Sequence, residues 1–121
     1  MRTMIIEDDM ATAILLTMML EEMGMEVCGA EATEAGAISV AATSLPDLII
    51  VDVNLRIGTG IAAVREILLH RYVPIVFVSA DLTQLRSENP QAIMLQKPYV
   101  HDQMVEAIER AVAIPFPIAV H

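Results

Sequence analysis

Short apolar runs and helical patterns alternate five times along the chain. The runs are bounded by charged residues, glycine or proline, and they predict strands at residues 3–6, 25–30, 48–54, 74–79 and 92–95. After each run, apolar residues recur at three- and four-residue steps, which predicts helices at residues 10–23, 34–43, 61–72, 82–88 and 100–112. Strands that alternate with helices in this way predict an α/β fold, a parallel sheet with helices on both faces.

The first and last predicted helices each carry an apolar stripe that we assign to the core. An acidic residue before Met10 is available as N-cap, and Gly24 ends the first helix. Spacing places five side chains of the first helix inward: Ile14, Leu15, Met18, Met19 and Met23. Spacing also places five inward on the last helix: Met104, Val105, Ile108, Ala111 and Val112. The methionines of the first helix are therefore interpreted as core rather than as a docking groove.

The third predicted strand contains a carboxylate where none is expected. Asp52 follows four apolar residues, in a run that is typical of a strand buried on both faces of a parallel sheet. A carboxylate inside such a strand costs free energy unless a charged or hydrogen-bonding partner lies beside it. Asp52 therefore predicts a site at this end of the strand.

Composition narrows the possible functions. The chain has 121 residues, which is enough for one core without disulfides, and its single Cys28 suits a reducing cytosol. A net charge of −9 argues against direct nucleic-acid binding. No apolar stretch approaches the ~18 residues that span a bilayer, and the acidic cluster from residue 7 does not fit a signal peptide. We expect a cytoplasmic protein with no membrane partner.

Polar residues end several of the predicted strands. Ligands of such folds bind outside the carboxyl ends of the strands, where Glu7, Asp8 and Asp52 would converge with Ser79 and Lys97. Clustered carboxylates repel one another, and Mg²⁺ suits one or two carboxylates with water and phosphate oxygens. A carboxylate nucleophile, Mg²⁺, a lysine and a hydroxyl are the parts needed to form an aspartyl phosphate.

These residues, in this order, resemble the receiver domain of bacterial two-component response regulators. The matching positions are Glu7-Asp8 after the first strand, Asp52 ending the third, Ser79-Ala80 ending the fourth and Lys97-Pro98 after the fifth. The resemblance covers about residues 2–112, and it implies a flavodoxin-like strand order 2-1-3-4-5. We expect a receiver domain at residues 1–114 and a short tail at residues 115–121 with no output domain.

The resemblance also implies roles for the matching residues. Asp52 would accept a phosphoryl group from a histidine kinase or a histidine phosphotransfer protein. Asp8, Asp52 and the backbone carbonyl of Asn54 would bind Mg²⁺, with Glu7 helping through water. Ser79 and Lys97 would contact the phosphoryl oxygens, and the Lys97–Pro98 bond would be cis. The implied protein is a stand-alone response regulator that loses its phosphoryl group by autodephosphorylation, is not otherwise an enzyme, and signals through contacts with a downstream protein.

The chain departs from the family pattern at several positions. Receivers usually carry an aromatic residue where this chain has Met94, and Tyr99 is an alternative switch residue, although packing under the last helix is the favoured interpretation. Arg56 stands where many receivers have proline. The strings around Asn54 and Lys97 resemble stand-alone receivers paired with HWE-type histidine kinases. Asp81 and Asn54 occupy positions that tune loss of the phosphoryl group in receivers.

Alternatives remain open for the site and for the function. Asp9 is the expected helix N-cap, but a metal pair of Asp8 and Asp9 is the other register. The chain is alternatively a degenerate receiver that acts as a phosphorylation-independent interaction module. A third hypothesis is a small phosphotransferase of the haloacid-dehalogenase type, against which the short chain and the early acidic pair argue.

Overall fold

Five parallel strands form one sheet in the order β2-β1-β3-β4-β5, as expected from the resemblance. We analysed a computed structural model, which describes residues 1–55 and 57–113. The strands are β1 (Arg2–Ile6), β2 (Glu26–Glu31), β3 (Leu48–Asp52), β4 (Ile75–Ser79) and β5 (Met94–Gln96). All four strand pairs are parallel. The tail predicted at residues 115–121 lies outside the described residues, as does Arg56.

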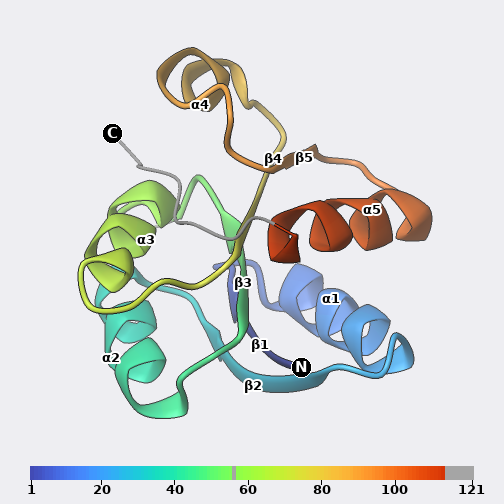
Figure 1. Ribbon diagram of the computed structural model, residues 1–121, viewed down its shortest axis with the longest axis horizontal. Coiled ribbons are helices and arrows are strands. Elements are labelled where there is room, and N and C mark those ends of the chain that lie inside the picture. Colours follow the sequence, from blue (N-terminus) through green and yellow to red (C-terminus); the bar gives the residue numbers. More distant parts are fainter. Residues whose placement is uncertain (56, 114–121) are drawn as a thin grey trace.

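Helices cover both faces of the sheet, and each face has its own apolar core. The helices are α1 (Met10–Glu22), α2 (Glu34–Ser44), α3 (Gly60–Leu68), α4 (Thr83–Glu88) and α5 (His101–Val112). Figure 1 shows α1 and α5 on one side of the sheet and α2 and α3 on the other, with α4 beyond the strands β4 and β5. Leu85 of α4 is buried in the same core as α2 and α3. In the part of the chain that is described, no helix is both long and apolar enough to cross a membrane.

Three element boundaries differ from the predicted ones for reasons that the hydrogen bonds show. β3 ends at Asp52 and not at Asn54, because the Asn54 amide turns back to donate to the Asp52 carboxylate, at 2.9 Å. α3 ends at Leu68, four residues early, because the next amides bond three residues back, from Leu69 to Glu66 and from His70 to Ile67. β5 begins at Met94 rather than Ala92, whose amide bonds Asn89 instead.

The inward face assigned to α1 was partly wrong. Leu16 and Leu20 are buried, whereas three of the assigned core residues are exposed: Ile14 (53%), Leu15 (66%) and Met18 (53%). Met19 and Met23 do pack against the core. Because apolar residues occur almost all round this helix, their spacing does not define one face. The face assigned to α5 was wrong at two positions, because Val112 is 40% exposed and Ala107, which was not assigned to the core, is buried.

Two leucines of α1 allow a matched test of this burial. Leu20→Ala should lower the free energy of unfolding by about 2–5 kcal/mol, because it leaves a cavity in the α1–α5 core. Leu15→Ala should change it by less than about 0.5 kcal/mol, because Leu15 is exposed. Urea unfolding followed by circular dichroism measures both. Equal losses for the two variants would contradict the orientation of α1.

Candidate functional site

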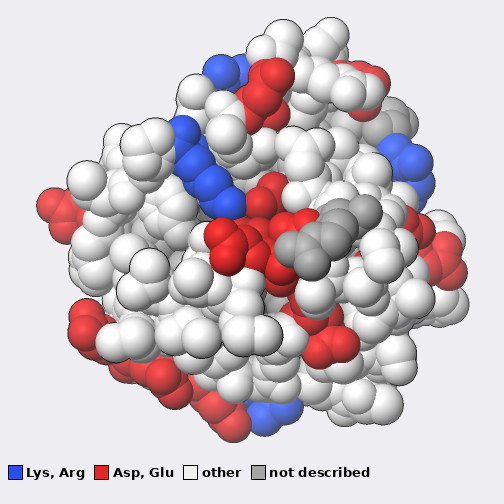
Figure 2. All heavy atoms as spheres, turned by 180° about the vertical axis from the view of Figure 1, so that it is seen from behind, with Lys and Arg blue, Asp and Glu red and all other residues white. Residues whose placement is uncertain are grey.

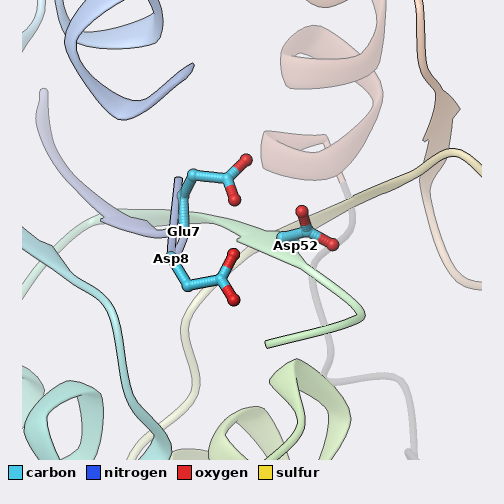
Figure 3. Close-up of side chains that lie close together, drawn as sticks. All are labelled: Glu7, Asp8 and Asp52. Carbon is cyan, nitrogen blue, oxygen red and sulfur yellow. The ribbon is translucent and has the colours of Figure 1, made fainter. Parts of the chain in front are cut away.

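Three carboxylates meet at the carboxyl ends of two neighbouring strands. Glu7 and Asp8 follow β1, and Asp52 ends β3, which pairs with β1. Each offers an oxygen within 4.8 Å of the others. Figure 3 shows the side chains of Glu7 and Asp8, at the end of β1, beside that of Asp52 on β3. The sequence order reverses between β1 and β3, so the cluster occupies the switch point where ligands of such sheets bind.

Lys97, which follows the edge strand β5, supplies positive charge to this cluster. Its ammonium nitrogen Nζ lies 2.7 Å from Glu7 Oε1 and 2.9 Å from Asp52 Oδ2. Its amide donates to the Ser79 carbonyl, which ties the residue after β5 to the end of β4. The Lys97–Pro98 peptide bond is cis, as the resemblance implied. Lys97 thus forms ion pairs with two of the three carboxylates.

For both Glu7 and Lys97, burial and hydrogen bonding shift the pKa in opposite directions. The Glu7 side chain is only 5% exposed, and this burial raises the pKa of Glu7, although the Lys97 hydrogen bond partly counteracts it. Burial acts to lower the pKa of Lys97, but the hydrogen bonds to Glu7 and Asp52 outweigh it and the pKa is raised. Lys97 is therefore held in its charged form, and Glu7 is a carboxylate that needs a cation beside it.

Asn54 and Ser79 form the other side of the site. Ser79 is buried at the end of β4, and its hydroxyl oxygen accepts a hydrogen bond from the Asn54 side-chain amide at 3.1 Å. The same oxygen accepts from the Asp81 amide at 3.3 Å. Both Asp52 oxygens also have partners, the Asn54 amide on Oδ1 and Lys97 on Oδ2. The phosphoacceptor candidate and the hydroxyl are thus linked through one asparagine.

Two further aspartates near the site serve as caps. Asp9 is the N-cap of α1, where its carboxylate accepts from the Ala11 amide and the Thr12 hydroxyl. The Thr12 hydrogen bond lowers the pKa of Asp9. Asp81 is exposed and accepts from the Thr83 amide at the start of α4, and this bond lowers its pKa. The carboxylates that cluster with Asp52 are Glu7 and Asp8, whereas Asp9 is committed to the helix.

The oxygen donors fit a hard divalent cation. Three carboxylates share one edge, and a single lysine lies against two of them, so the cluster retains excess negative charge. Figure 2 shows acidic side chains gathered in the middle of one face, with a basic side chain reaching them. Grooves on either side are lined partly by α1, one including Met10 and Ile14 and the other including Leu15. Exposed apolar side chains therefore flank the acidic cluster.

Comparison with known proteins identifies the family. The family model described as response regulator receiver domain matches residues 3–109. The chain belongs to this receiver family. It is 34% identical over 116 residues to the transcriptional regulatory protein PdtaR of Mycobacterium tuberculosis, a match that covers 93% of this chain and 57% of PdtaR. The chain thus spans about half the length of that curated relative.

Solved receiver structures agree with the fold. The PhyR receiver domain of Erythrobacter litoralis is 27% identical with a TM-score of 0.87, and the match covers 98% of this chain and 95% of that one. The receiver domain of the sensor histidine kinase PA1611 of Pseudomonas aeruginosa is 27% identical with a TM-score of 0.81, over 93% and 98% of the two chains. That structure is described with a magnesium ion coordinated in its active site cleft.

The site predicted from the sequence is brought together, but its internal contacts were not foreseen. Glu7, Asp8, Asp52 and Lys97 meet as expected for a receiver. The direct Glu7–Lys97 ion pair and the Asn54–Ser79 hydrogen bond carried no signal in the sequence. Their partners are 90 and 25 residues apart, so no local spacing reports them.

Met94 and Tyr99 lie against different cores. Met94 is half-buried against the core that contains Phe77 and Leu85, and it pairs with Phe77 across β4 and β5. Tyr99 packs against the opposite core, which contains Met104 of α5, and burial raises the pKa of Tyr99. Packing of Tyr99 under the last helix was the favoured interpretation and is confirmed. Cys28 is likewise half-buried against the core that Met94 contacts.

Replacing Lys97 with Met should raise the pKa of Glu7 further, because burial and the Asp52 charge remain while the ammonium donor is lost. The folded carboxyl already binds its proton more tightly than the usual pKa of 4.5 implies. Stability should therefore fall as the pH rises from 4.5 through the folded pKa, and in the variant this fall should extend to higher pH. Carbon-13 NMR titration of the Glu7 carboxyl measures the shift.

The control is Arg86→Met, which removes a positive charge from an exposed position on α4. It should leave the titration of Glu7 unchanged. A Glu7 carboxyl that titrates at the same pH in the wild type and in Lys97→Met would show that the ion pair does not govern its charge.

Proposed function

We propose that this receiver accepts a phosphoryl group on Asp52 in a Mg²⁺-dependent reaction. The donor is a phosphohistidine of a histidine kinase or of a histidine phosphotransfer protein, and the signal leaves through protein–protein contacts. The observation that carries the proposal is Lys97, whose ammonium lies 2.9 Å from Asp52 inside an acidic cluster at the strand switch point. The proposed nucleophile Asp52, the acidic cluster and the ammonium group of Lys97 thus share one edge of the sheet.

In the proposed reaction an Asp52 carboxylate oxygen attacks phosphorus and forms the O–P bond. The N–P bond of the phosphohistidine breaks, and the imidazole nitrogen keeps the bonding electron pair. The Asn54 amide and Lys97 each hold one Asp52 oxygen, which orients the carboxylate before attack. Lys97 then offsets negative charge on the phosphoryl oxygens, and the Ser79 hydroxyl donates a hydrogen bond to one of them.

The proposed metal ligands are Glu7, Asp8, Asp52 and the backbone carbonyl of Asn54, with Glu7 acting through water. Bound Mg²⁺ would offset negative charge that builds up between the carboxylates and the incoming phosphoryl group. The excess of carboxylates over lysine supports this assignment. The magnesium ion described for the Pseudomonas receiver supports it by likeness.

The kinase or phosphotransfer protein must approach Asp52 at the carboxyl end of the sheet, where it clusters with Glu7 and Asp8. On α1, the grooves beside this cluster and beside Lys97 are lined by exposed apolar side chains, Met10, Ile14 and Leu15. Exposed apolar side chains next to a reactive site favour a protein partner over a small-molecule substrate. We therefore propose that the receiver signals through protein contacts in the cytoplasm, with α1 contributing to partner binding.

Magnesium should stabilise the folded protein, because it binds the native cluster and not the unfolded chain. Millimolar Mg²⁺ should raise the melting temperature and shift the amide NMR signals of residues 7–9 and 52–54. Asp8→Asn should greatly weaken both effects, whereas Asp102→Asn, which changes an exposed carboxylate on α5, should preserve them. The metal assignment is wrong if wild-type protein shows neither effect.

Treatment with acetyl phosphate and Mg²⁺ should add one phosphoryl group to the wild type, visible in the intact mass, and none to Asp52→Asn. Omitting Mg²⁺ should abolish the gain, and Lys97→Ala should keep the fold but blunt the response. The product should be acid-stable and labile to hydroxylamine, as an acyl phosphate is. A phosphate on Ser79 or on a histidine would refute the proposal, and no mass gain would favour a phosphorylation-independent interaction module.

A further inference from the structure

The two ends of the loop that follows Asp52 lie close together. It connects β3 to α3 through residues 53–59, and the Gly60 amide donates back to the Val53 carbonyl at 3.0 Å. Asn54 and Thr59 pair across the loop as an antiparallel bridge. A shift of Thr59 is therefore transmitted to Asn54, the residue that contributes a backbone carbonyl to the proposed metal site and holds Ser79.

A side chain from another element closes on this loop. Glu34 is the first residue of α2, and its Oε2 accepts a hydrogen bond from the Thr59 amide at 3.2 Å. The preceding residue, Thr33, forms a parallel bridge with Ile57. The start of α2 therefore contacts the loop through the backbone at Ile57 and through a carboxylate at Thr59. Neither contact involves the proposed ligands themselves.

Gly58 makes room for this carboxylate. Its φ of +79° is a conformation that residues with a side chain rarely adopt. A Cβ at this position would also overlap the Glu34 side chain, whose Cβ would lie 2.7 Å away. Glycine thus serves two needs here, since it allows the turn and leaves space for Glu34 to lie over it. This close fit distinguishes the Glu34 contact from a chance contact between surface side chains.

We propose that Glu34 is a positioning residue that holds the β3–α3 loop, and with it Asn54, in the conformation that binds the cation beside Asp52. The inference rests on the proposed function for the identity of the cation. Ordering a loop costs conformational entropy, and a loop that is already held in the metal-free protein does not incur that cost on binding. Glu34 therefore tightens Mg²⁺ binding without touching the ion.

A plain electrostatic effect has to be separated from this role. Any carboxylate near the site attracts a cation, so loss of the Glu34 charge alone weakens binding to some extent. Glu34→Gln loses the charge but keeps an oxygen that can accept from the Thr59 amide, whereas Glu34→Ala loses both. Glu31, at the end of β2, offers a matched charge control, because Glu31→Gln removes one charge from a nearby carboxylate.

The experiment is an NMR titration of the amide signals with Mg²⁺ for the wild type and the three variants. Glu34→Ala should raise the Mg²⁺ dissociation constant about threefold to tenfold, as expected for loss of one charge-assisted hydrogen bond. Glu34→Gln should stay near Glu31→Gln, with both within about twofold of the wild type. Amide hydrogen exchange without Mg²⁺ should become faster at Thr59 and Asn54 in Glu34→Ala, but not in Glu34→Gln.

Two results would overturn the proposal. One is equal weakening of Mg²⁺ binding in all three variants, which would reduce Glu34 to a remote charge. The other is unchanged exchange at Thr59 and Asn54 in Glu34→Ala, which would show that Glu34 does not hold the loop. If wild-type protein fails to bind Mg²⁺, the metal assignment fails by itself, and the exchange data still decide whether Glu34 holds the loop.

Discussion

The structure depends on how charge is accommodated at the carboxyl end of the sheet. Glu7 and Asp52 lie on adjacent strands with little exposure, and without a cation between them their carboxylates would repel in a region of reduced dielectric. Lys97 bridges the two at 2.7 and 2.9 Å. The lysine reaches them only because β4 and β5 carry the chain back to the same edge, where the Lys97 amide is bonded to Ser79. Strand order and charge balance are therefore linked, since the order β3-β4-β5 brings Lys97 to the same edge as the carboxylates.

Further hydrogen bonds surround the contacts that Lys97 makes with Glu7 and Asp52. The Asp52 carboxylate accepts from the Asn54 amide, the Asn54 side chain donates to Ser79, and the loop after Asn54 is bonded to Glu34 of α2. The last two bonds join β4 and α2 to the loop after β3, so the geometry beside Asp52 depends on α2 and β4 as well as on its own strand. Preorganisation of this kind lowers the cost of binding an ion or a phosphoryl group, because little remains to be ordered.

The fold and the cluster were predictable because their signals are local and periodic. Buried strands appear as short apolar runs, and parallel strands bring their carboxyl ends to one edge, which sufficed to place Glu7, Asp8, Asp52 and Lys97 together. The inward face of α1 was not predictable, since apolar residues surround that helix and only tertiary packing selects Leu16 and Leu20. Glu34 was missed for another reason. Its contact with Thr59 joins residues 25 apart through a side chain, and nothing in the spacing of either segment reports it.

The departure at Met94 is accommodated by the same network. In a receiver that signals by rotation of an aromatic side chain, the hydroxyl at the end of β4 moves and the aromatic fills the space behind it. Here Ser79 is held by Asn54 and by the Asp81 amide, and Met94 is half-buried against the core that contains Phe77 and Leu85. Methionine adapts its shape to a changing cavity at little cost, so it does not favour two discrete positions. Hydrogen bonds connect Asp52 with the start of α4 through Asn54, Ser79 and Asp81, whose carboxylate accepts from the Thr83 amide. Thr83, the first residue of α4, is thus two hydrogen bonds from the Ser79 hydroxyl, by way of Asp81.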